Sequence, residues 1–147
     1  MQAESTAGAT AGATASPEPG LIAYTHVIYA LHALTVVSGA VTTPIFMPFG
    51  FVCGLPSAVA VLMNYARRSD ARGTWLESHF RWQIRTFWYA TLWVIVVSLV
   101  AIPLLLIGVG FVIGLFGLGS VAAWIIYRVL RGWLALRDRR PMPLAMT

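Results

Sequence analysis

The sequence has no lysine, a single cysteine and only five acidic residues in 147 positions. Cys53 stands alone, so no disulfide can form within the chain, and its apolar surroundings are typical of a small buried hydrophobe. No acidic residue lies inside a long apolar stretch, which excludes an intramembrane carboxylate relay. The motifs of metalloproteases, serine hydrolases and phosphate-binding loops are also missing. We therefore predict no enzyme, no cofactor and no metal site.

What the sequence does have is apolar residues. Hydrophobic residues make up 59% of the chain and charged residues 10%, whereas a soluble domain carries about 25% charged residues. A chain this small cannot bury so much apolar surface in its own core, so lipid must cover much of it. Residues 1–20 are small and polar and are expected to form a disordered tail, with a second short tail at 141–147.

Four apolar stretches have roughly the length that crosses a hydrocarbon core of about 30 Å. They cover about residues 21–41, 45–66, 86–107 and 111–127. Proline and glycine interrupt the second stretch, and Pro103 marks either a kink or the approach to a turn. We predict an all-α, integral membrane four-helix bundle over residues 21–140, with an amphipathic cytoplasmic extension opening the third helix. A cleaved signal peptide is the weaker alternative, because no basic residue precedes the first stretch.

The third helix is expected to begin in water at Thr74, where Glu77 would complete a capping box. Its start is charged and aromatic, as suits the membrane–water interface. The basic segment 128–140 is expected to leave the membrane along its surface, as a topology anchor or as a site for anionic lipid. The candidate interaction or lipid-facing residues of both segments are Trp75, His79, Arg81, Trp82, Gln83, Arg85, Arg128 and Arg131.

A polar stripe marks the first apolar stretch. Thr25, Tyr29 and His32 follow i, i+4, i+7 spacing and share one helix face. Polar groups inside a membrane turn toward the protein interior, so we expect this stripe to face the bundle. Hydrogen bonding between helices is the favoured interpretation of the stripe, and a ligand site is the alternative.

A stripe of small residues marks the fourth stretch. Gly110, Gly114 and Gly117 form a face that lets another helix approach closely. That helix could belong to the same chain, which is favoured, or to a second copy in a homo-oligomer.

All ten basic residues are arginines, and they fall within residues 67–85 and 128–140. The first-to-second and third-to-fourth connections contain none. Short loops rich in arginine remain in the cytoplasm, so we predict a multi-pass protein of the inner membrane with both termini cytoplasmic.

The third stretch opens with W-L-E-S-H-F-R-W-Q-I-R-T-F, in which an aromatic residue is followed by His79, Gln83 and Phe87. Together with a histidine-bearing first span and a broken second span, this run resembles the Tic-twenty-like superfamily of small bacterial membrane proteins. That superfamily is named after a protein-import component of the chloroplast inner envelope. The resemblance covers roughly residues 21–140 and implies a four-helix protein of the bacterial inner membrane from an uncharacterised branch.

The expected function is that of a structural or interaction module of the inner membrane. Its arginine- and tryptophan-rich segments would contact the lipid bilayer and a membrane or cytoplasmic protein partner. Nucleic acid is not an expected partner, because the arginines flank membrane spans. The alternative is a small transporter or channel subunit, which would oligomerise to build a path lined by the first, second and fourth spans. The absence of charge inside the spans favours the interaction module.

Overall fold

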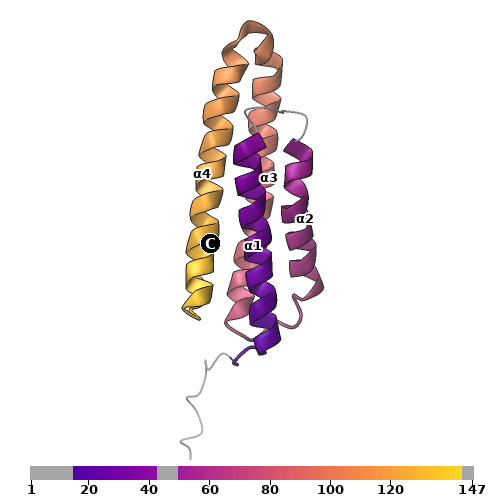
Figure 1. Cartoon of the computed structure of the whole chain (residues 1–147), viewed down its shortest axis with the longest axis vertical. Coiled ribbons are helices and arrows are strands. Elements are labelled where there is room, and N and C mark those ends of the chain that lie inside the picture. The colour runs from indigo at the N-terminus through magenta and orange to yellow at the C-terminus, as the bar shows by residue number, and fades with distance from the viewer. Residues whose placement is uncertain (1–14, 43–49, 144–147) are drawn as a thin grey trace, which may run out of the picture.

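The computed structural model describes residues 15–143 except 43–49, and it leaves the side chains of residues 40–42 and 50–53 undescribed. In the described ranges the chain forms four α-helices (Figure 1), which confirms the predicted all-α, four-helix architecture. The elements are α1 (Pro19–Thr42), α2 (Gly50–Ala66), α3 (Leu76–Leu104), the short 3₁₀ helix η2 (Leu105–Ile107) and α4 (Val109–Arg137). The predictions for residues 1–14, 43–49 and 144–147, and for the Cys53 side chain, lie outside the described part.

Among the described residues, three helical segments are long and apolar enough to cross a membrane. They are Pro19–Gly39, Leu76–Ile107 and Val109–Arg137. The helix α2 has 17 residues, a length of about 26 Å at 1.5 Å per residue, and is shorter than the other three. The predicted second span begins at residue 45, so its first residues lie outside the described ranges.

The helices form two antiparallel pairs that lie side by side. The helix α1 packs on α2, α3 packs on α4, and the ring is closed by contacts of α1 with α4 and of α2 with α3. In Figure 1 the hairpin between α3 and α4 projects well beyond the ends of α1 and α2. Gly108 makes this hairpin possible with φ 78°, a left-handed conformation that glycine adopts without strain. Pro103 lies in the last turn of α3, so it marks the approach to this hairpin.

Both arginine clusters lie at the opposite end of the bundle, where α2 and α4 end and α3 begins. The Trp82 indole N–H donates to the carbonyl oxygen of Arg128 at 3.3 Å, and the Arg128 Nε donates to the Thr86 hydroxyl at 2.7 Å. Helices α3 and α4 are antiparallel, so residues 67–85 and 128–140 must share one end. The fold thus has the charge asymmetry that the topology prediction requires.

The start of α3 differs from the predicted capping box. The helix begins at Leu76, and Trp75 at its N-cap makes no side-chain cap bond. The Thr74 hydroxyl instead donates to the Ala71 carbonyl at 2.8 Å, so its hydrogen bond lies within the preceding turn and not at the helix start. The Glu77 carboxylate accepts the backbone N–H of Gly73 at 3.1 Å and pairs with Arg81. The prediction that Thr74 caps α3 is therefore wrong, although the Glu77 carboxylate does accept a backbone N–H at the helix start.

The end of α4 also differs from expectation. The fourth helix continues without a break to Arg137, ten residues beyond the predicted end of the span. Gly132 and Leu136 are buried, and a Cβ on Gly132 would lie 2.5 Å from the Tyr29 hydroxyl. Residues 128–137 are therefore part of the bundle and do not form a separate segment along the membrane surface.

The glycine face of α4 packs within the protein. A Cβ on Gly114 would lie 3.7 Å from the Cβ of Ala101, and one on Gly117 would lie 2.7 Å from Val97 Cγ1. Both neighbours belong to α3. Of the two predicted uses of this face, the structure shows the contact inside one chain.

Candidate interaction site at the arginine-rich end

The eight predicted interaction residues divide between the interior and the surface. His79 is 0% exposed and Gln83 is 2% exposed, although both were expected on an interfacial surface. They share the buried face of α3 with Leu76 and Phe80, at i, i+3, i+4, i+7 spacing. Half-buried side chains are those of Trp75, Trp82 and Arg128, and exposed ones are those of Arg81, Arg85 and Arg131. The predicted extension is thus a bundle helix whose outer face alone reaches the surface.

His79 joins three parts of the chain. Its Nε2 lies 2.8 Å from the carbonyl oxygen of Arg140, and its Nδ1 lies 3.0 Å from the Tyr29 hydroxyl. A carbonyl only accepts, so Nε2 carries the proton and Nδ1 accepts from Tyr29. The imidazole therefore ties α1 and α3 to the segment that follows α4, and both of its nitrogens are used in doing so.

The polar stripe of α1 faces the bundle, as predicted. Thr25, Tyr29 and His32 are all buried. Tyr29 bonds to α3 through His79, and His32 Nδ1 lies 2.8 Å from the Ser57 hydroxyl on α2. The Thr25 hydroxyl donates to its own helix, at Leu21. Two of the three residues thus make the contacts between helices that the sequence favoured.

Aromatic contacts complete the same end of the bundle. The Trp133 indole N–H donates to His26 Nδ1 at 3.0 Å, and the Tyr29 ring stacks on Trp133 with 6.5 Å between centroids. The Arg128 guanidinium lies 3.6 Å from the centroid of the Trp82 ring, a cation–π distance. These contacts fix α1, α3 and α4 relative to one another, so the arginines nearby are presented from a rigid base.

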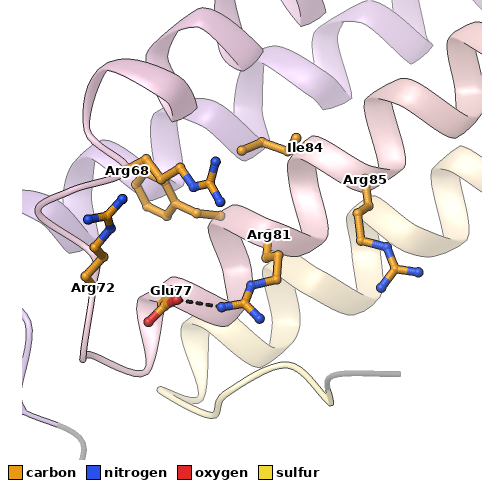
Figure 2. Close-up of a pocket in the computed structure, with 7 residues that line it drawn as sticks. Arg68, Arg72, Glu77, Arg81, Ile84 and Arg85 are labelled. Carbon is orange, nitrogen blue, oxygen red and sulfur yellow. Dashed lines mark hydrogen bonds and ion pairs between the residues drawn. The ribbon is translucent and has the colours of Figure 1, made fainter. Parts of the chain in front are cut away.

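The outer face of this base carries an opening of about 100 Å³ (Figure 2). Arg68 and Arg72 reach it from the turn before α3, and Arg81 and Arg85 reach it from α3 itself. Its remaining lining residues are Glu77, Phe80 and Ile84. Four arginines and one carboxylate therefore line this opening together with two apolar side chains, and this excess of positive charge is suited to an anion.

Most of the arginines around the opening have no carboxylate partner among the described residues. In the described part of the chain, the ion pairs are Arg67–Asp70 at 3.0 Å and Arg81–Glu77. Asp70 also raises the pKa of the Arg67 guanidinium through its hydrogen bond. No carboxylate lies within ion-pair distance of Arg68, Arg72 or Arg85 in the same residues.

Arg81 and Arg85 were predicted from the sequence as interaction residues, whereas Arg68 and Arg72 were not. The turn between α2 and α3 is short, so it brings residues 68 and 72 back beside the first turns of α3. The sequence pattern does not show this proximity.

Comparisons with protein families, curated proteins and solved structures find no match for this chain. The fold itself defines the class: over the residues that the structure describes, the protein is all-helical, three of its helices are compatible with membrane crossing, and its arginines gather at one end. The likeness to the Tic-twenty-like superfamily stays a prediction from the motif in α3.

Proposed function

We propose that the protein is an interaction module embedded in the bacterial inner membrane, which binds an anionic partner through the opening lined by Arg68, Arg72, Arg81 and Arg85. The observation that carries this proposal is the excess of guanidinium over carboxylate around that opening. The arginine-rich end and both termini would lie in the cytoplasm, because arginine-rich ends of membrane helices are retained there.

The support for a fixed binding surface comes from the interior. Leu76, His79 and Phe80 anchor the first turns of α3 on their buried face, while Arg81 and Arg85 project from the opposite face. A partner would thus meet guanidiniums whose backbone is already ordered, which lowers the entropy lost on binding. The Tic-twenty-like assignment is part of the same proposal, and its support is the motif containing His79, Gln83 and Phe87.

Reversal of two charges at the opening tests this function. We expect Arg81→Glu with Arg85→Glu to reduce the amount of co-purifying anionic partner by about tenfold or more, because attraction becomes repulsion. The measurement is native mass spectrometry of the full chain extracted from its own membranes in mild detergent. The matched control is Arg137→Glu with Arg139→Glu, two exposed arginines at the same end of the bundle. Equal partner recovery from all three proteins would contradict the proposal.

A small transporter or channel subunit is the second candidate. One observation favours it: in the described residues, buried polar atoms of His32, Asn64 and Gln83 have no hydrogen-bond partner in the protein. The glycine face of α4, however, is filled by Val97 and Ala101 and cannot line a path. We therefore favour the interaction module.

Flux measurements separate the two candidates. We expect proteoliposomes of the purified chain to pass protons and potassium no faster than protein-free liposomes, because the glycine face of α4 is covered by α3 side chains and offers no path. A flux that is present with the wild-type chain and lost in His32→Ala would establish transport instead.

A further inference from the structure

The exposed face of α3 changes in character along the helix. Arg81, Arg85, Trp88 and Leu92 follow i, i+4, i+7, i+11 spacing and therefore share one face. Trp88 is 56% exposed and Leu92 is 53% exposed, and the same face continues with exposed aliphatic residues. From the arginine-rich end, the order is guanidinium, aromatic ring, aliphatic chain. That order matches the layers of a membrane from headgroup to hydrocarbon.

The neighbouring helix α2 repeats this order. Leu55, Val59 and Leu62 are exposed along α2, Tyr65 is exposed near its end, and Arg68 follows in the turn. The Trp88 indole N–H donates to the Tyr65 hydroxyl at 3.2 Å, which joins the two aromatic layers. The opening between Arg68 and Arg85 therefore continues into apolar surface on both helices.

We infer that the opening binds the phosphate of an anionic phospholipid, whose acyl chains lie along the exposed faces of α2 and α3. This inference rests on the proposed function and names the chemistry of its partner. Guanidinium groups bind phosphate oxygens in pairs of parallel hydrogen bonds. Glu77 already neutralises Arg81, so Arg68, Arg72 and Arg85 supply the charge for the phosphate. Phe80 and Ile84 give the glycerol backbone and the first methylenes an apolar floor.

The apolar continuation distinguishes a lipid from other anions. A free phosphate or an acidic peptide would use the guanidiniums but leave the faces beyond Trp88 and Tyr65 without a role. A phospholipid uses both, because its phosphate and acyl chains are joined at the distance over which this surface changes from basic to apolar. Tryptophan and tyrosine at the boundary are the residues that membrane interfaces favour.

Lipid titration of the full chain tests the inference. The protein, stripped of lipid in a non-ionic detergent, is titrated with short-chain phosphatidylglycerol, and bound lipids are counted by native mass spectrometry. Parallel arms use short-chain phosphatidylcholine, which has no net charge, and glycerol 3-phosphate, which has no acyl chain. We expect one phosphatidylglycerol molecule to bind, with an affinity about tenfold or more above that of phosphatidylcholine or glycerol 3-phosphate.

Two variants assign the binding to this opening. The first variant combines Arg68→Gln, Arg72→Gln and Arg85→Gln, and we expect its affinity for phosphatidylglycerol to fall about tenfold or more. The control variant combines Arg137→Gln, Arg139→Gln and Arg140→Gln. It loses the same amount of positive charge, and we expect its affinity to stay near that of the wild type. All six arginines are exposed, so both variants should unfold at the wild-type temperature. Trp88→Ala should lower the affinity for phosphatidylglycerol and leave any binding of glycerol 3-phosphate unchanged.

Each contrary outcome has a definite meaning. Equal affinity for phosphatidylcholine, equal affinity of the triple variant, or equally tight glycerol 3-phosphate would each overturn the lipid inference. If phosphatidylglycerol binding fails these tests while a protein companion is lost in Arg81→Glu with Arg85→Glu, the partner is an acidic protein and the proposed function survives. If neither lipid nor protein responds to these arginines, both proposals fail.

Discussion

Replacing Gly110 by alanine is expected to reduce the free energy of unfolding by about 3 kcal/mol, a large effect for one methyl group. The added Cβ would lie 2.1 Å from the Ala101 carbonyl oxygen, 2.4 Å from the Leu105 nitrogen and 2.6 Å from the Leu104 carbonyl carbon. All three are backbone atoms, so no side-chain rotation can relieve the overlap. The start of α4 would have to move away from the end of α3, and their close packing would be lost.

Two glycines on the same helix provide matched controls. A Cβ on Gly114 would meet Ala101 Cβ at an ordinary 3.7 Å, and one on Gly119 would meet nothing within 4 Å. Gly114→Ala and Gly119→Ala should therefore unfold like the wild type, or slightly later because alanine favours helix. The measurement is reversible unfolding in mixed detergent micelles, followed by tryptophan fluorescence. Wild-type stability of Gly110→Ala would show that α3 and α4 do not meet at this point.

The helices and their small-residue face could be predicted because they depend on local properties. Apolar length identifies the long helices, and the spacing of Gly110, Gly114 and Gly117 identifies the face that another helix covers. Pro103 and Gly108 likewise mark the turn near residue 108. The offset of the α1–α2 pair from the α3–α4 pair along the bundle axis was not predictable, since it depends on contacts such as that of Tyr29 with Gly132.

The candidate site was predicted only in part. The start of α3 carries polar and aromatic residues all round, so its composition alone does not show which face is buried. A better signal was available in the i, i+3, i+4, i+7 spacing of Leu76, His79, Phe80 and Gln83. That pattern assigns His79 and Gln83 to the interior and leaves the arginines outside. The contribution of Arg68 came from the geometry of the turn, which no periodic pattern encodes.

The largest polar effect is expected at His79. We expect His79→Ala to cost about 3 kcal/mol, because it leaves the Tyr29 hydroxyl and the Arg140 carbonyl without their partner and opens a cavity among buried side chains. Tyr29→Phe should cost about 1 kcal/mol, since it leaves only His79 Nδ1 unpaired. Unfolding free energies in mixed micelles measure both.

The double variant shows whether the two residues act through the bond between them. Tyr29→Phe combined with His79→Ala should cost about 1 kcal/mol less than the two single changes added together, because the shared hydrogen bond can be lost only once. Thr25→Val is the matched control, since Thr25 is equally buried but donates within its own helix at Leu21. It should cost less than about 1 kcal/mol and add independently to His79→Ala. Strict additivity of Tyr29→Phe and His79→Ala would mean that the imidazole does not hold α1 to α3, and the rigid base under the arginines would then need another origin.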